Sequence, residues 1–212
     1  MTLSIDRSDV TFANQTINEF LGNVAASAVT PSGGAVAAIG GASGAALCEM
    51  VCIHTIEKDG YTDAQTELTG IRDELGNHRN RLLELADEDS MAVDELQTAF
   101  ETSNNGDRTD LIQEKSRQAA EVPLEIAETC LDILKHARVV TANGNRNALA
   151  DAGTGAFLAH SAHQASIFTV QSNLALIEDT TIVTEIEERL TEVDGDAAKA
   201  LKQVKMNVEE TV

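Results

Sequence analysis

The chain has 212 residues and a formal net charge of −20, from 15 basic and 35 acidic residues. This charge repels phosphate backbones and anionic lipid surfaces, so we expect neither nucleic-acid nor membrane partners. Apolar residues make up 42% of the chain, as in ordinary globular proteins, and a single domain over 1–212 is expected. Aromatic residues make up only 3%, so the core must be built from Ala, Leu, Val and Ile.

The acidic residues are spread along the whole chain and Lys is scarce. This pattern is typical of a halophilic protein, whose high-salt cytoplasm screens the self-repulsion. An ordinary acidic cytosolic protein is the plain alternative. The three cysteines, an odd number, do not form a disulfide framework, and the N-terminus lacks the basic and apolar regions of a signal peptide. A cytoplasmic location is therefore expected.

Helical periodicity is common and strand-like alternation is rare, which predicts an all-α, single-domain helical bundle. The spacing of apolar residues predicts six helices, at 11–28, 34–56, 63–101, 108–138, 148–177 and 181–208.

A break follows the first helix. Pro31 disfavours helix at the residue before it, and Gly33 and Gly34 permit positive φ. Free backbone N–H groups at the next helix start attract anions, and glycine lets a ligand approach the backbone. An ordinary loop-to-helix turn is the alternative interpretation, which chemistry alone favours.

The second predicted helix is rich in Ala and Gly, and each interior Gly costs about 1 kcal/mol relative to Ala. Such a helix is stable only if other helices pack closely against it, so we expect it at the centre of the bundle. It is also the most apolar stretch, but its glycines argue against a membrane span. Cys48 and Cys52 could supply two metal ligands, yet no further ligands lie nearby in sequence, so a structural role is favoured. Lys58 follows as a cation at the helix end, where it could simply complement the helix dipole.

The third predicted helix carries an apolar stripe from Leu68 to Phe100 in steps of three and four, which predicts one buried face. Two members of the stripe are polar, His78 and Asp89. Asp87 lies about 200° around the helix from Asp89 and should face away. A buried carboxylate such as Asp89 can act as an acid or base, or it can be a structural residue bonded to a backbone end. His78 lies about 16 Å from Asp89 along the helix, so the two do not form a dyad.

After a predicted loop at 102–107, Pro123 is expected to bend or break the fourth helix. The fifth helix follows a second loop and is again built from small residues, so it should pair tightly with the second. Asp151 near its start is on the ordinary interpretation a cap or dipole partner. His160 and His163 share a helix face but lack the further ligands that a metal site needs. The charged segment 177–212 is expected to be a peripheral helix.

Four segments in this order resemble the formiminotetrahydrofolate cyclodeaminase and methenyltetrahydrofolate cyclohydrolase family. The first is the Pro-Gly turn and Ala/Gly helix TPSGGAVAAIGGASGAALCEMV at 30–51. The others are LLELADED at 82–89, AAEVPLEIAE at 119–128 and GNRNALADAGTGAFLAHSAHQASIFTVQSNL at 144–174. The order and spacing agree over roughly 15–176. The turn departs from the family pattern of three glycines followed by Ser, because Ser32 and Ala35 take the outer places.

The resemblance implies an all-α fold, a homodimer and a one-carbon tetrahydrofolate substrate, with no metal and no cofactor beyond that substrate. It points to Asp89 as the catalytic carboxylate with Asp151 assisting. The substrate-binding residues that we expect are Ser32, Gly33, Gly34, Lys58, Asn147 and Asn173. The two asparagines could hydrogen-bond the edges of the pterin ring.

The predicted reaction is hydrolysis of 5,10-methenyltetrahydrofolate to 10-formyltetrahydrofolate. Cyclodeamination of 5-formiminotetrahydrofolate with release of ammonia is the alternative, and a non-catalytic folate-binding dimer or a metal-binding bundle are further ones. The cyclohydrolase is preferred because cyclodeamination is useful mainly where a formiminotransferase domain supplies the substrate, and this chain has no room for one.

Overall fold

The structure is a computed structural model that describes residues 11–102 and 108–210. These residues form helices and no strand, which confirms the predicted all-α class. The elements are η2 (Phe12–Asn14), α1 (Ile17–Val24), α2 (Gly33–Ile56), α3 (Thr62–Glu101), α4 (Arg108–Asn143), η3 (Arg146–Ala148), α5 (Leu149–Leu174) and α6 (Thr180–Glu209). Most of the loop predicted at 102–107 lies outside the described residues.

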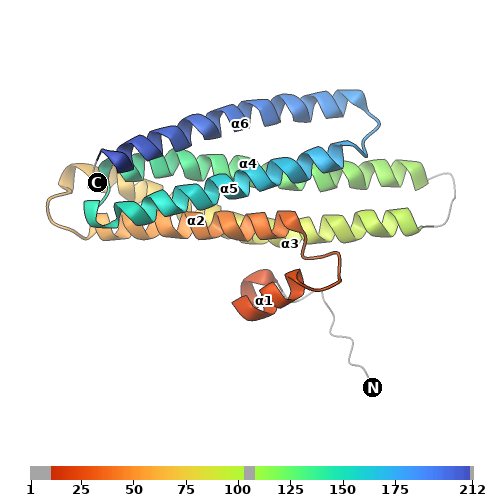
Figure 1. The fold of residues 1–212 in the computed structure, drawn as a ribbon, viewed down its shortest axis with the longest axis horizontal. Helices are drawn as coiled ribbons and strands as arrows, with labels where there is room; N and C mark the ends of the chain where they lie inside the picture. Colours follow the sequence, from red (N-terminus) through yellow and green to blue (C-terminus); the bar gives the residue numbers. More distant parts are fainter. Residues whose placement is uncertain (1–10, 103–107, 211–212) are drawn as a thin grey trace, which may run out of the picture.

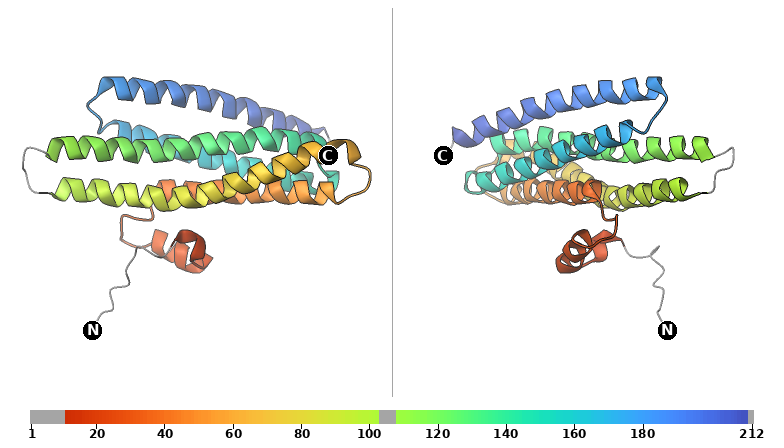
Figure 2. Two further views of the ribbon diagram at one scale, coloured as in Figure 1. Left: turned by 180° about the vertical axis from the view of Figure 1, so that it is seen from behind. Right: turned by 45° about the vertical axis from the view of Figure 1, so that its right-hand side comes forward.

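Four long helices, α2 to α5, run alongside one another, and α6 lies along the outside of α4 and α5 (Figure 1). α6 is an outer helix, as predicted, and it buries one face through a row of apolar residues that includes Ile186, Leu190, Ala197 and Val204. The short helix α1 stands away from the bundle in all views (Figure 2).

The first predicted helix, 11–28, was wrong in extent. Thr16 caps α1 by accepting a hydrogen bond from the N–H of Glu19, whose carboxylate in turn accepts from the N–H of Thr16. This capping box starts the helix at Ile17. The residues before it form only the short helix η2, and α1 ends at Val24.

The fourth helix was predicted to bend or break at Pro123 and to end at 138. It does not break there, because α4 continues through Pro123 to Asn143. Proline removes the N–H that would bond the carbonyl four residues earlier, here that of Ala119. The side-chain amide of Asn173 on α5 donates to that carbonyl at 2.5 Å. The neighbouring helix thus satisfies the group that Pro123 leaves free.

α2 lies at the centre because its glycines let two other helices approach. A Cβ added at Gly44 would lie 2.5 Å from the carbonyl oxygen of Gly155 on α5, and one at Gly41 would lie 2.7 Å from Sγ of Cys130 on α4. These separations leave no room for a side chain, so the predicted tight pairing of α2 with α5 is confirmed. Among the described helices, α2 alone is long and apolar enough to cross a membrane, and half of its apolar window is buried. A helix buried in a protein core meets the same criterion.

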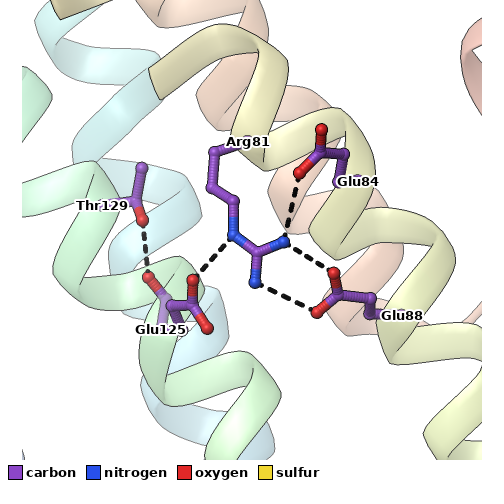
Figure 3. A network of polar contacts seen from close by, with 5 residues as sticks. All are labelled: Arg81, Glu84, Glu88, Glu125 and Thr129. Atoms are coloured by element: carbon purple, nitrogen blue, oxygen red, sulfur yellow. Dashed lines mark hydrogen bonds and ion pairs between the residues drawn. The ribbon is translucent and has the colours of Figure 1, made fainter. Parts of the chain in front are cut away.

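Arg81 ties α3 to α4 (Figure 3). Its guanidinium contacts Glu125 of α4 at 2.7 Å, and Glu88 and Glu84 of its own helix at 2.6 and 3.2 Å. The hydroxyl of Thr129 donates to the backbone carbonyl of Glu125 one turn earlier. The partners are about one-third to two-thirds exposed, so each pair contributes about 1 kcal/mol or less. The network therefore sets the alignment of the two helices more than it adds stability.

Candidate functional site

The predicted carboxylate and the predicted glycine turn meet in the structure. Asp89 of α3 is 2% exposed, and its Oδ2 accepts hydrogen bonds from the Ser32 hydroxyl at 2.6 Å and from the backbone N–H of Ala35 at 2.9 Å. Ser32 is the N-cap residue of α2 but makes no capping bond of its own. Asp89 therefore supplies the cap from a different helix and lies against the positive end of the α2 dipole.

Gly34 makes this contact possible. A Cβ added at Gly34 would lie 2.1 Å from Oδ1 of Asp89, far inside van der Waals contact. Gly34 is itself buried, so it does not offer its backbone to a ligand in the way that the sequence suggested. Gly33 is exposed, and an added Cβ there would meet no protein atom within 4 Å. The two glycines thus serve different purposes, one inside the protein and one at its surface.

Burial is the largest influence on Asp89 and raises the pKa of its carboxyl, against the hydrogen bonds from Ser32 and Ala35, which lower it. A raised carboxyl pKa suits a group that takes up and returns a proton near neutral pH. The two adjacent acidic residues make different contacts. Asp87 accepts a hydrogen bond from the N–H of Phe12 at 2.9 Å, and Glu88 pairs with Arg81. Asp89 is the inward-facing member of the trio, as predicted.

A groove of about 480 Å³ runs from this turn between α2 and α5. The residues that line it include Ser32, Gly33, Val36 and Gly40 on one side and Leu158 and Ser161 on the other. None of its lining residues carries a charge. Its volume lies in the range of small-molecule sites, and the hydroxyl of Ser32 connects it to the buried carboxylate of Asp89.

Lys58 and Asn147, also predicted as binding residues, lie together at the other end of α2. Nζ of Lys58 donates to Oδ1 of Asn145 at 3.0 Å, and the backbone N–H of Asn147 donates to the same oxygen at 3.1 Å. Asn145 is buried and its own N–H donates to the Thr55 hydroxyl at 2.8 Å. The sequence analysis missed Asn145 as the organising residue. Its signals were its place in the loop before a helix of small residues and in the family-like segment at 144–174, and neither distinguishes it from its neighbours.

The two groups of predicted site residues are far apart within one chain. α2 has 24 residues and is about 36 Å long at 1.5 Å per residue, with the Asp89 turn at one end and Lys58 beyond the other. Asp151 is exposed in the first turn of α5, and the next residue, Ala152, lies beside Cys48. Cys48 is fourteen residues after Gly34, about 21 Å along the helix. One chain therefore does not bring Asp151 to the atoms that Asp89 contacts.

Asn173 lies in a third place. Its amide bonds the carbonyl of Ala119, as described above, and so it has a structural partner. The role predicted for it, hydrogen bonding to a pterin edge, stays a prediction that must compete with this bond.

The histidines and cysteines are engaged in packing. His163 is fully buried with Nδ1 2.9 Å from the carbonyl oxygen of Ala127, and the His78 ring lies 5.6 Å from that of His136. Burial raises the pKa of the Cys48 and Cys52 thiols to about 12. Thiols of such high pKa stay protonated and are poor metal ligands. Among the described residues, no three His, Cys, Asp or Glu side chains are grouped as metal ligands would be.

Comparison with known proteins assigns the family. The family model described as formiminotransferase-cyclodeaminase matches residues 16–192. The chain belongs to this family. It is 34% identical over 192 residues to the methenyltetrahydrofolate cyclohydrolase of Methylorubrum extorquens, covering 88% of this chain and 91% of that protein.

Other family members confirm the fold. A crystal structure of formiminotetrahydrofolate cyclodeaminase from Thermotoga maritima superposes with a TM-score of 0.89 and 29% identity, covering 93% of this chain and 98% of that one. The formimidoyltransferase-cyclodeaminase of Rattus norvegicus is 26% identical over 85% of this chain, which matches only 34% of the rat protein. The family resemblance stated from the sequence is therefore confirmed.

Proposed function

We propose that this protein hydrolyses 5,10-methenyltetrahydrofolate to 10-formyltetrahydrofolate. The observation that carries the proposal is the buried Asp89 carboxylate, whose Oδ2 holds the Ser32 hydroxyl at 2.6 Å at the end of an uncharged groove. The 34% identity to a protein named for this activity, over nearly its whole length, supports it. The reaction needs a group that can move protons and that can also stabilise the positive charge on the reacting carbon. An ionised carboxylate can do both.

The chemistry follows from this geometry. The ionised Asp89 carboxylate first stabilises the positive charge of the amidinium. Water then attacks the amidinium carbon and passes one proton through the Ser32 hydroxyl to Asp89, which becomes neutral. The bond from that carbon to N5 then breaks, N5 takes the proton back from Asp89, and the second proton of the water leaves to solvent as the formyl C=O forms. Water and the methenyl cation thus give the formyl product and one proton. No metal or redox cofactor takes part in this proposal.

The test is replacement of Asp89 by Asn, which keeps the shape and one acceptor oxygen for the α2 cap. We expect turnover, followed as loss of methenyltetrahydrofolate absorbance over the buffer rate, to fall about 10²- to 10⁴-fold. Circular dichroism and urea unfolding should show that Asp89→Asn still folds. A folded Asp89→Asn variant with wild-type turnover would remove Asp89 from the mechanism.

Cyclodeamination of 5-formiminotetrahydrofolate is the second candidate, which the likeness to the Thermotoga maritima cyclodeaminase favours. Release of ammonia from that substrate, without acceleration of methenyl hydrolysis, would support it. Binding of folate without either reaction would support a non-catalytic folate-binding protein.

We further propose a homodimer that works in a salt-rich cytoplasm. The support is the outer side of α2, which is free of charge at Gly33, Val36, Gly40 and Ser43 although the chain carries −20. A second copy can approach such a charge-free face with little electrostatic penalty. A second copy could also bring its Asp151 to the Asp89 site, which one chain does not do.

A further inference from the structure

The segment before α2 is a closed loop whose two ends are bound to one side of α3. At one end, the backbone N–H of Phe12 donates to Oδ1 of Asp87 at 2.9 Å. At the other end, the Thr30 hydroxyl donates to Oδ1 of Asp94 at 3.1 Å. Asp87 and Asp94 are two helical turns apart, so they lie on the same side of α3 at a separation of about 10 Å along its axis. α1 lies between the two ends and projects from the bundle on a base that α3 holds (Figure 1 and Figure 2).

The projecting helix α1 exposes apolar side chains that its own bundle does not cover. Ile17 is 80% exposed, and Leu21, one turn later on the same side, is 56% exposed. Phe20 is buried, with its ring 5.5 Å from that of Phe12 within the same loop. Glu19 is the one charged residue of α1, and its carboxylate is engaged in the capping box. An exposed apolar ridge on a helix with so little charge is typical of a contact surface.

The outer side of α2 and α5, which borders α1, is free of charge. No Asp, Glu, Lys or Arg occurs in 33–48 or in 152–177, although the chain has 35 acidic residues. On α5 this face exposes Leu158 and Phe168, and Phe168 is 69% exposed. Val24, at the end of α1, lines the same groove as Leu158. The apolar side of α1 and the uncharged face are therefore continuous on one chain.

We propose that α1 of each chain packs on the uncharged face of a second copy, with Ile17 and Leu21 against Phe168 of the partner subunit. This inference rests on the proposed homodimer and adds the contact that holds it together. The chain's own bundle leaves Ile17 exposed although both ends of the loop are bound, so its cover comes from another molecule.

A second copy is the partner that fits. Each chain carries both the projecting helix and the face that receives it, so a two-fold axis pairs both surfaces at once. The contact also brings two chains of −20 together through side chains that carry no charge, which keeps their acidic residues apart.

Mixed cross-linking tests the contact directly. Ile17→Cys and Phe168→Cys proteins are mixed in 2 M KCl and oxidised. Burial raises the pKa of all three native thiols to about 12, so the introduced thiols react first. We expect a covalent product of two chains in which peptide mass spectrometry finds positions 17 and 168 joined. A mixture of Gly70→Cys and Phe168→Cys is the control and should give no such link, because Gly70 is exposed on α3.

Charge variants test the same contact in solution. Ile17→Glu places a carboxylate in the apolar contact, so the dimer Kd, measured by analytical ultracentrifugation in 2 M KCl, should rise about tenfold or more. Gly22→Glu adds the same charge to α1 about 140° around the helix. An added Cβ there meets nothing within 4 Å, so the Kd should stay unchanged.

The outcomes separate this inference from the homodimer itself. A dimer that shows no link between positions 17 and 168 and tolerates Ile17→Glu would overturn the inference and leave the homodimer standing. A link that forms only within single chains of the doubly substituted protein, at the mass of a monomer, would also overturn it, because the chain's own α5 would then cover α1. A wild-type protein that is monomeric in 2 M KCl would instead refute the homodimer.

Discussion

At the scale of single residues, the contact between Asp89 and the start of α2 combines a structural role with the chemical role that we propose for it. The carboxylate caps α2 through Ala35 and holds the Ser32 hydroxyl at the groove, both through Oδ2. Of the two interpretations that the sequence left open, the structural Asp bonded to a backbone end is observed, and the proposed acid–base group uses the same carboxylate. A change that displaces the carboxylate should cost both stability and turnover.

Gly34→Ala is the change that displaces it. The new methyl group would lie 2.1 Å from Oδ1 of a side chain that is buried and held by two hydrogen bonds, so Asp89 must move. We expect a loss of about 1–3 kcal/mol in the free energy of unfolding, measured in urea, together with a large fall in turnover. Gly70→Ala is the control, because an added Cβ at Gly70 meets no atom within 4 Å, and its stability should not fall. A Gly34→Ala protein as stable and active as wild type would show that the carboxylate does not need this position.

The sequence could predict that Asp89 points inward, because its place on the apolar stripe of α3 follows from helical periodicity. It could also predict the glycine turn. It could not predict that the two meet, since residues 57 positions apart in sequence are brought together only by the packing of α2 on α3. The same limit applies to Asp151. The family resemblance predicted that it assists Asp89, but the distance between the two residues depends on how α5 is aligned with α2, which the sequence does not give.

At the scale of elements, α4 shows how a neighbouring helix overrides a local signal. Propensity predicts a break at Pro123, and within α4 alone that prediction is sound, because the Ala119 carbonyl loses its donor. The amide of Asn173 supplies the missing donor from α5. The helix positions themselves were predictable, since long amphipathic periods are strong signals, while the continuity of α4 through Pro123 depends on a bond from another helix and was not.

A double-mutant cycle tests this interpretation of Asn173. Asn173→Ala leaves the Ala119 carbonyl without a donor and should cost about 1–3 kcal/mol in urea unfolding. In a Pro123→Ala background the new backbone N–H can bond that carbonyl, so the same Asn173→Ala change should cost clearly less. The difference between the two costs is the coupling between the residues. Equal costs in both backgrounds would mean that Asn173 acts elsewhere, and a binding defect in a stable Asn173→Ala protein would support the predicted pterin contact.

At the scale of the whole molecule, charge sets the conditions under which the protein can associate. Each chain carries −20, so two chains repel one another at low salt even though the outer side of α2 is free of charge. α2 is largely apolar. Its Glu49 pairs with Arg79 of α3 at 3.0 Å, and it exposes large apolar side chains at Val36 and Ile53. A helix this apolar is normally covered. The fold thus presents a face suited to a second copy, while the rest of the surface opposes its approach.

This balance predicts that association strengthens with salt. The Debye length falls from about 10 Å at 0.1 M to about 3 Å at 1 M, which removes most of the repulsion between two chains but leaves apolar burial intact. We expect light scattering to give twice the chain mass of 22.5 kDa in 2 M KCl, with dissociation and a lower melting temperature at 0.1 M. Replacing Val36 by Glu should place a charge on the α2 face and shift the dimer toward monomer at any salt concentration. A protein that stays monomeric in 2 M KCl would refute the homodimer, whereas a dimer that is insensitive to salt would refute the part assigned to charge.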